Sequence, residues 1–515
     1  MRMFSRRHLT SMQPKAYLAG AAGPETTSAL PPPKEPIRRL LASLDRMGLR
    51  YCHWKSNLRL GESLAGEGDL DLLIDRQDAA GFQTALVESG FKLAVSANGA
   101  GHPGVFHAFA LDPDAPQLLH VHAYFQIVTG DSLVKAYHLP VESALLANTR
   151  RLHGVPVPTV EAELVLFALR IALKHTSLAE LFLLQRHYDL VLQELKWLCA
   201  SANSDKAEEL WTAWFPGAPV SLLHDLIEAI AEPRAMVRRI LLGRQVAGQL
   251  RGWRRLNTLS EALSRMQRVL LLLLRRRRRL IPTAAGLVIA FVGPMGTGKS
   301  TLSLASARIL GHHFDVRAVH VGKPPATFVS LLPRLILPLA RRILPGHRSS
   351  ARAEREQKQN VPPSLLNTLW LTVLAHDRRA LLSRCWRYAA AGSIVIADRY
   401  PSATLGAVDS SRFDDEALAR CGRGPKQWLM RRERALYTGL PQPTLVIRLT
   451  APIETSLRRD AVRIKKEGPD PAAVKRRRKI EMETEFPNSR VISVDTDQPL
   501  EDTVKAVMKA LWSSV

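Results

Sequence analysis

A glycine-rich segment followed by a lysine and a serine carries the clearest chemical signal in the sequence. Residues 293–300 read Gly-Pro-Met-Gly-Thr-Gly-Lys-Ser and match the GxxxxGK[ST] pattern. Its glycines would let backbone N–H groups turn inward around phosphate oxygens. Lys299 would reach the β- and γ-phosphates of a nucleotide, and the Ser300 hydroxyl would bind a magnesium ion. The predicted nucleotide contacts are Gly293, Gly296, Thr297, Gly298, Lys299, Ser300 and Thr301.

An acidic and a basic residue, Asp398 and Arg399, directly follow a predicted apolar strand at residues 393–397. Because open α/β sheets bind their ligands at the carboxyl ends of the strands, we expect both side chains to face the phosphates. Asp398 would hold the metal ion through water, and Arg399 would neutralise charge on a phosphoryl group in transfer. The alternative interpretation is a structural ion pair at the end of a strand.

Alternating helix and strand patterns would position these residues. Residues 287–292 form a continuous apolar run, which is typical of a buried parallel strand, and a helix is predicted after the loop at residues 300–310. Further strands are predicted at residues 316–321, 393–397, 444–449 and 491–494. The region 286–512 is therefore predicted to be an α/β domain, a parallel sheet with helices on both faces.

Two carboxylates in the N-terminal part form a second candidate site. Asp69 and Asp71 lie in or beside a predicted strand, and the alternation of side chains places both on one face. Two such carboxylates can hold magnesium and a nucleoside triphosphate. His120 and His122 also alternate along a strand predicted at residues 118–125, where a structural role is favoured over a metal site.

Composition and patterning divide the chain into four parts. Residues 1–35 are rich in Pro, Ala and Ser, and are predicted to be a disordered tail without a signal peptide. Residues 36–159 mix helix and strand patterns, whereas residues 160–280 are almost wholly helical and are predicted to connect that α+β domain to the domain at 286–512. The arginines of residues 275–279 mark the boundary. The Leu- and Arg-rich run at residues 269–279 is interpreted as the exposed end of a connecting helix, and an amphipathic surface anchor is the alternative.

The size and charge of the chain limit the number of its domains and the kinds of partner that it can have. With 515 residues and a net charge of +25, it is expected to form two or three domains and to attract phosphate-bearing ligands. Nucleic acid is the less favoured partner, because only 6% of the residues are aromatic and no stacking platform is evident.

Four widely separated cysteines predict neither a zinc site nor disulfides, which favours a reducing cytoplasm. No transmembrane segment is predicted, and a homodimer is compatible with the sequence.

The segment at residues 369–405 resembles the centre of thymidylate kinase-like proteins. An Asp-Arg pair on a predicted helix, an apolar strand, an Asp-Arg-Tyr and a serine follow one another in the order and spacing of that family. The matching residues are Asp377, Arg378, Asp398, Arg399, Tyr400 and Ser402. Residues 441–454 continue the resemblance, and the basic segment at residues 463–479 stands in the place of the family's lid.

This resemblance implies that the γ-phosphoryl group of ATP is transferred, with magnesium, to a nucleoside monophosphate or a related small acceptor. It implies that Arg378 and Arg399 bind the acceptor phosphate, and that Asp398 organises the magnesium ion and the acceptor. Together with Lys299, these three would be the catalytic residues. It also implies a phosphate clamp in the lid, with four candidates: Arg463, Arg476, Arg477 and Arg478.

Two positions depart from the thymidylate kinase pattern. Met295 stands in the phosphate loop where those enzymes usually have an acidic residue, and Val408 stands where they tend to have a glutamine near the base. Each departure would leave a polar group of the acceptor without a partner. Thymidine monophosphate is therefore expected to be a poor acceptor.

Residues 68–74 resemble the acidic strand of polymerase-β-like nucleotidyltransferases, especially a loosely characterised bacterial branch. Lys55 precedes that strand, as is common in the branch. Active members of the wider superfamily often have a third carboxylate on a later strand, and here His122 takes that place. The resemblance implies a nucleotidyltransferase-like domain, and the departure argues against two-metal catalysis.

Three other functions fit the same residues. A kinase acting on a sugar or on a lipid-linked intermediate of surface polysaccharide synthesis would share the phosphate site, and product analysis with a panel of acceptors would identify it. A nucleotide-regulated binding module would bind ATP without forming product. A nucleic-acid-binding ATPase would show hydrolysis stimulated by nucleic acid.

Overall fold

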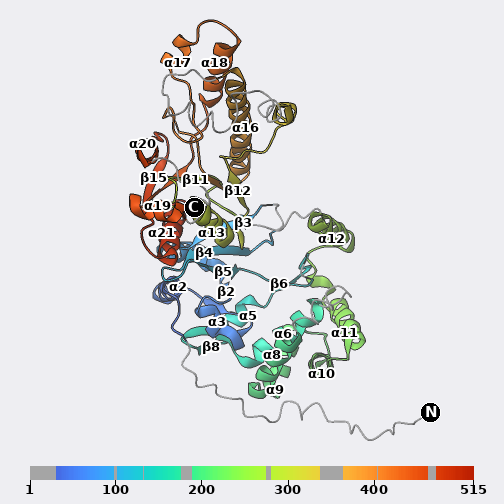
Figure 1. Cartoon of the computed structure of the whole chain (residues 1–515). Coiled ribbons are helices and arrows are strands. Elements are labelled where there is room, and N and C mark those ends of the chain that lie inside the picture. Colours follow the sequence, from blue (N-terminus) through green and yellow to red (C-terminus); the bar gives the residue numbers. More distant parts are fainter. Residues whose placement is uncertain are drawn as a thin grey trace, which may run out of the picture. The chain divides into compact units, whose positions relative to one another are not determined.

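The computed structural model describes residues 31–97, 101–131, 133–174, 188–273, 280–336, 364–402, 404–461 and 471–515. The chain forms two compact units, which we call unit 1, chiefly up to residue 278, and unit 2, chiefly from residue 279 (Figure 1). Most of the predicted tail and the basic run at 275–279 lie outside the described residues. Within the described ranges, no helix is both long and apolar enough to cross a bilayer.

The core of unit 2 is a five-stranded sheet in the order β12-β13-β11-β14-β15. Every neighbouring pair in it is parallel, as the continuous apolar runs predicted. Its strands are β11 (Leu287–Val292), β12 (Val316–His320), β13 (Ile394–Asp398), β14 (Leu445–Thr450) and β15 (Arg490–Asp495), and a short β10 (Leu280–Pro282) precedes them.

Helices cover both faces of this sheet. Leu382 and Cys385 of one long helix, α16, pack with Val288 and Ala290 of β11 in a shared core. All six residues of β11 are buried, so its alternate side chains are covered as well, where α13 and α21 contact the sheet. The helices of unit 2 are α13 (Lys299–Gly311), α16 (Leu365–Ala390), α17 (Asp415–Arg420), α18 (Pro425–Tyr437), α19 (Ile453–Ala461), α20 (Pro471–Met482) and α21 (Leu500–Trp512). The α/β prediction with a parallel sheet is confirmed.

Unit 1 contains a mixed sheet in which the strands run β1-β2-β5-β4-β3. Only β2 and β5 pair in parallel among these neighbours; the others are antiparallel. Two small hairpins, β6–β7 and β8–β9, accompany the sheet. The strands are β1 (Tyr51–His53), β2 (Leu70–Ile74), β3 (Lys92–Ser96), β4 (Val105–Leu111), β5 (Leu118–Tyr124), β6 (Ile127–Thr129), β7 (Tyr137–Leu139), β8 (Thr149–Leu152) and β9 (Val155–Pro158).

The helices of unit 1 bury their apolar faces in two cores. One joins α2 and α4 to the sheet; the other joins α6 and its helical neighbours to Cys52, Trp54 and Tyr124 of the strand-rich part. The helices predicted as a connector therefore share a core with the strands. They are α2 (Glu35–Arg46), α3 (Leu60–Leu64), α4 (Ala79–Glu88), α5 (Glu142–Ala147), α6 (Val160–Lys174), α8 (Tyr188–Ser201), α9 (Ser204–Trp214), α10 (Val220–Ala231), α11 (Met236–Gln249) and α12 (Thr258–Leu273), with 3-10 turns at Asn57–Arg59, Arg76–Asp78 and Arg251–Trp253.

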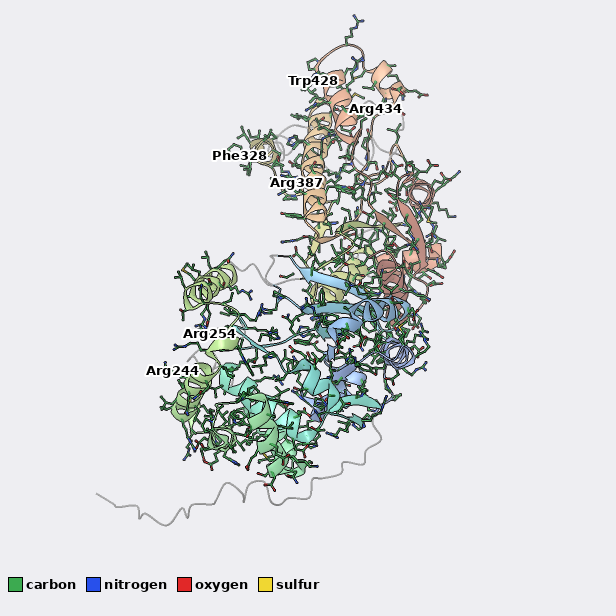
Figure 2. All side chains as sticks on the ribbon, turned by 180° about the vertical axis from the view of Figure 1, so that it is seen from behind. Arg244, Arg254, Phe328, Arg387, Trp428 and Arg434 are labelled. Carbon is green, nitrogen blue, oxygen red and sulfur yellow. The ribbon has the colours of Figure 1, made fainter. Side chains whose placement is uncertain are left out.

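Basic side chains lie on both units. Figure 2 shows Arg244 and Arg254 on unit 1, and Arg387 and Arg434 on unit 2. The net positive charge is thus spread over the molecule, so charge by itself does not single out a site.

Candidate active site

The glycine-rich loop joins β11 to α13 and packs tightly against the neighbouring backbone. Gly293 has φ 133°, and a Cβ there would lie 2.3 Å from the carbonyl oxygen of Leu449. Gly296 has φ 78°, and a Cβ there would lie 2.4 Å from the carbonyl oxygen of Ser456. Only glycine fits these two positions, so the loop can wrap closely in front of the N-terminus of α13, where anions bind favourably.

Lys299 lies over this loop. Its Nζ donates hydrogen bonds to the carbonyl oxygens of Gly293 at 2.8 Å and Pro294 at 2.6 Å. Thr297 is fully buried, and its hydroxyl donates to the same Pro294 oxygen at 2.8 Å, which braces the turn. The ammonium group is thus held next to the space that the loop encloses, as binding of phosphate oxygens requires.

Ser300 and Asp398 meet at the adjoining ends of α13 and β13. The Ser300 hydroxyl donates to Asp398 Oδ2 at 2.6 Å, and His320 Nδ1 lies 3.4 Å from the same oxygen. Asp398 Oδ1 is buried and has no hydrogen-bond partner among the described residues. A hydroxyl beside a carboxylate with a spare oxygen fits magnesium, whose remaining ligands would be water and phosphate oxygens. In the described part of the chain, no group of three His, Cys, Asp or Glu could hold a metal ion.

The two arginines expected to bind an acceptor phosphate converge on Asp409. Arg378 is buried on α16, forms an ion pair with Asp409 and donates to the Tyr437 hydroxyl at 2.8 Å. Arg399 has φ 73°, and its Nη1 lies 3.6 Å from Asp409 Oδ2. A Cβ on Gly322 would lie 3.1 Å from Arg399 Cδ and 3.2 Å from Asp409 Oδ2, so a small residue is needed there. Asp409 was not predicted, because no sequence pattern marks this loop position.

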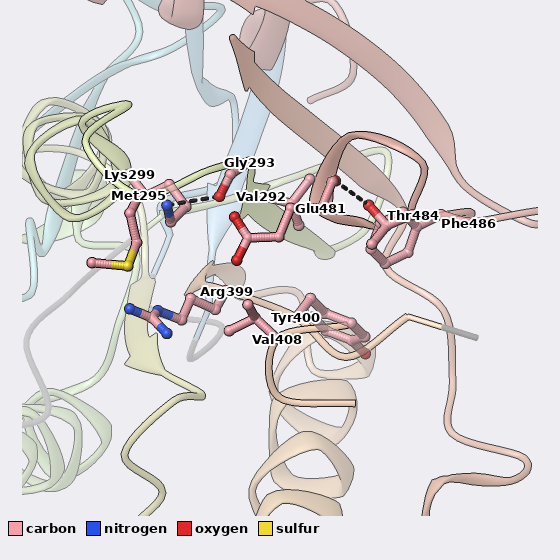
Figure 3. Close-up of a pocket in the computed structure, with 10 residues that line it drawn as sticks. All are labelled: Val292, Gly293, Met295, Lys299, Arg399, Tyr400, Val408, Glu481, Thr484 and Phe486. Carbon is pink, nitrogen blue, oxygen red and sulfur yellow. Dashed lines mark hydrogen bonds between the residues drawn. The ribbon is translucent and has the colours of Figure 1, made fainter. Parts of the chain in front are cut away.

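A pocket lies between the phosphate loop and Arg399. Met295 and Val408, the two departures from the thymidylate kinase pattern, both line it. So does Glu481 of α20, which is only 6% exposed. Figure 3 shows its carboxylate turned toward Lys299 and Arg399. The sequence analysis missed Glu481, which lies just beyond a basic segment interpreted as a lid. The full lining is Val292, Gly293, Met295, Lys299, Arg399, Tyr400, Val408, Glu481, Thr484 and Phe486.

A second hollow lies on the other side of the loop. Thr301 of α13 and Arg459 of α19 line it. Arg459 is held in place by hydrogen bonds to Thr496, of which the one to the carbonyl oxygen is 2.8 Å long. The hollow adjoins Gly296 and Gly298, so a group attached to a phosphate chain on the loop could enter it.

The lid candidates are only partly described. Arg463 lies outside the described residues, and so do the side chains of Arg476 and Arg477. Arg478 is described: it donates to the carbonyl oxygen of Ala451 and, at 3.3 Å, to the Ser456 hydroxyl. It therefore ties α20 to the end of β14 and to α19.

No model of a known protein family matches the chain, and no curated protein is similar to it. Function is therefore inferred from the geometry of the sites themselves.

The two carboxylates of unit 1 are both paired with basic groups. Asp71 Oδ1 lies 2.8 Å from Lys55 Nζ and 3.2 Å from His122 Nδ1, and Asp69 Oδ1 lies 2.7 Å from His120 Nδ1. Burial opposes ionisation of Asp71, but Lys55 and His122 outweigh it and hold the pKa of Asp71 well below its usual range. A metal ion bound to these two oxygens would have to displace Lys55, His120 and His122. The magnesium site at Asp69 and Asp71 stays a prediction.

Three histidines of unit 1, His107, His120 and His122, form a stack on β4 and β5. The His107 ring lies 4.5 Å from that of His122 and 5.2 Å from that of His120, with His107 Nδ1 3.0 Å from His120 Nε2. Burial lowers the pKa of His122 to about 4 and that of His107 to about 3, so both are neutral near pH 7. This arrangement agrees with the structural role expected for the histidines.

Proposed function

We propose that unit 2 is a thymidylate kinase-like P-loop domain that transfers the γ-phosphoryl group of ATP, with magnesium, to a nucleoside monophosphate or a related small acceptor. The observation that carries the proposal is the hydrogen bond from Ser300 to Asp398. It joins the phosphate loop and the acidic end of β13 in one site, next to Lys299 and the pocket. Phosphoryl transfer needs these parts together, because it depends on positioning and charge neutralisation more than on covalent chemistry.

Each residue has a role in such a transfer. The loop backbone and Lys299 would bind the phosphates, while Ser300 and Asp398 would hold the magnesium ion, which neutralises charge on the phosphate oxygens. Arg399 faces the pocket from the wall opposite the phosphate loop and would neutralise charge on the phosphoryl group during its transfer. The nucleoside of ATP would occupy the second hollow, beside Thr301 and Arg459.

Arg378 receives a different role from the one the resemblance implies. Its guanidinium is buried and holds Asp409 and Tyr437, so it would position Arg399 through Asp409. The buried pair also costs desolvation, which argues that it serves geometry more than stability.

For unit 1, we propose a nucleotidyltransferase-like domain without two-metal catalysis. The carboxylate pair at β2 and the imidazole in place of a third carboxylate support it. Lys55, Lys135 and Arg170 surround the aromatic pair Trp54 and Tyr124, which gives the site a positive character.

A second candidate function is a kinase of a sugar or of a surface-polysaccharide intermediate. The apolar Met295 and Val408 in the pocket favour it over an ordinary thymidylate kinase. A screen of ATP consumption over nucleoside monophosphates, nucleosides, sugars and sugar phosphates tests both candidates. ATP binding without any product would support a binding module instead, and hydrolysis stimulated only by nucleic acid would support an ATPase.

A further inference from the structure

The charges around the pocket of unit 2 bear on the class of acceptor. Of the residues that line it, Lys299 and Arg399 are cationic and Glu481 is anionic. Lys299 lies over the phosphate loop, where the donor phosphates would engage it. Among the described lining residues, Arg399 is therefore the cation that remains, and its Nη1 lies 3.6 Å from Asp409 Oδ2.

Arg378 does not supply a second cation for an acceptor phosphate. All three of its guanidinium nitrogens have acceptors: Nε faces the carbonyl oxygen of Val321 at 3.4 Å, Nη1 binds Tyr437, and Nη2 binds Asp409. Its side chain is 9% exposed and is not part of the pocket lining. An acceptor phosphate would have to compete with Asp409 for both arginines.

Glu481 makes a phosphate at this place still less favourable. It lies in the last turn of α20, where the Thr484 hydroxyl donates to its carbonyl oxygen at 2.9 Å and closes the turn. Its buried carboxylate points into the pocket between Lys299 and Arg399 (Figure 3). A phosphate dianion would meet a like charge there in a partly desolvated site, whereas a neutral hydroxyl would meet a hydrogen-bond acceptor.

We infer that the acceptor is a phosphate-free polyhydroxy compound, of the nucleoside or sugar class, and that Glu481 binds its reacting hydroxyl. This inference rests on the proposed phosphoryl transfer and narrows it. The acceptor oxygen forms a bond to the γ-phosphorus while the bond from that phosphorus to the bridging oxygen breaks, and its electron pair leaves with ADP. The hydroxyl proton passes to the Glu481 carboxylate and then to water.

Matched acceptor pairs test the inference in the full chain. Thymidine is compared with thymidine monophosphate, and glucose with glucose 6-phosphate, by kcat/KM with magnesium and ATP. The unphosphorylated member of at least one pair should be better by about tenfold or more. Better use of the phosphorylated members would overturn the inference while leaving the kinase function intact. No turnover with any acceptor, despite measurable ATP binding, would count against both.

Variants test the role of Glu481. Glu481→Gln should lower kcat for the preferred acceptor by about 100-fold, with the KM for ATP changed less than about threefold. It should also shift the ratio of kcat/KM toward the phosphorylated member of each acceptor pair, because the carboxylate that repels a phosphate is gone. Glu483→Gln, an exposed neighbour beyond the same helix, is the matched control and should behave as wild type. An unchanged rate and preference in Glu481→Gln would contradict the assignment.

A binding measurement does not depend on guessing the acceptor. Inorganic phosphate is titrated into protein saturated with magnesium and a non-hydrolysable ATP analogue. We expect no binding below about 10 mM that depends on Arg399. Phosphate binding that is present in the wild type and lost in Arg399→Ala would overturn the inference.

Discussion

The Ser300 hydroxyl donates a hydrogen bond of 2.6 Å to Asp398 Oδ2, although the two residues lie 98 positions apart in the sequence. The contact links the first turn of α13 to the carboxyl end of β13. Because β13 pairs directly with β11, the strand that leads into the phosphate loop, both sides of the candidate site rest on two adjacent strands. Rigid strands of this kind can hold a phosphate chain and a metal ion in fixed register.

Asp398→Asn should abolish most magnesium-dependent turnover. The amide keeps the size of the side chain and can still accept the bond from Ser300, but it loses the negative charge that would hold the ion. We expect a fall in kcat/KM of about 100-fold or more. The measurement is the steady-state rate over a magnesium titration, with Asp502→Asn on the exposed side of α21 as the control. An unchanged magnesium requirement would remove Asp398 from the site.

Arg399→Ala should lower turnover much more than it lowers ATP affinity. The guanidinium faces the phosphate loop across the pocket, where it is assigned to the phosphoryl group in transfer, so its loss should lower kcat by about 100-fold. Isothermal titration with a non-hydrolysable ATP analogue gives the affinity, and Arg420→Ala on α17 is the control. An equal loss of ATP affinity would place Arg399 at the donor phosphates instead.

Glu163 should make the stability of unit 1 depend on pH. Burial raises the pKa of this carboxyl to about 7, from 4.5 in an unperturbed glutamate. The folded state thus holds a proton that the unfolded state releases, so the contribution is present below about pH 4.5 and is lost as pH rises to about 7. The loss should be about 3 kcal/mol. The free energy of unfolding, measured by urea titration across this pH range, should fall more steeply with pH in the wild type than in Glu163→Gln. An equal pH dependence in the two proteins would refute the prediction.

Asp71→Asn should destabilise unit 1. It leaves Lys55, a largely buried cation, without its carboxylate partner at 2.8 Å, and breaking such a pair costs about 3 kcal/mol. Removing the charge of Lys55 as well, in the double variant Asp71→Asn, Lys55→Met, should recover part of the lost free energy of unfolding. The free energy of unfolding is measured by urea titration, with and without magnesium. A stabilisation of the wild type by magnesium that Asp71→Asn removes would show that the metal site exists after all.

The core strands of unit 2 could be predicted from sequence, because a strand buried on both faces needs a continuous apolar run. The run at residues 287–292 coincides with β11, and the run at 393–397 lies within one residue of β13 (Ile394–Asp398). The phosphate loop could be predicted as well, because its glycines are required by close approaches to Leu449 and Ser456.

The pocket walls could not be predicted in the same way. Glu481 and Asp409 reach the site through long-range packing, and neither lies in a pattern with its own spacing. The strand β4 was also missed, since a short apolar run with one histidine does not distinguish strand from helix. Arg378 could be selected from its Asp-Arg motif, but its ion pair with Asp409 could not, because only the folded chain brings the two side chains together.

Product formation by the full chain, compared between wild type and Lys299→Ala, tests the central claim most directly. Both proteins are incubated with magnesium, ATP and the acceptor panel, and phosphorylated products are identified by mass spectrometry. We predict a phosphorylated product with the wild type and a rate at least about 100-fold lower with Lys299→Ala, corresponding to about 3 kcal/mol of barrier, at an unchanged unfolding midpoint. A near-wild-type rate in Lys299→Ala, or no product from a wild-type protein that binds ATP, would contradict the assignment of unit 2 as a kinase.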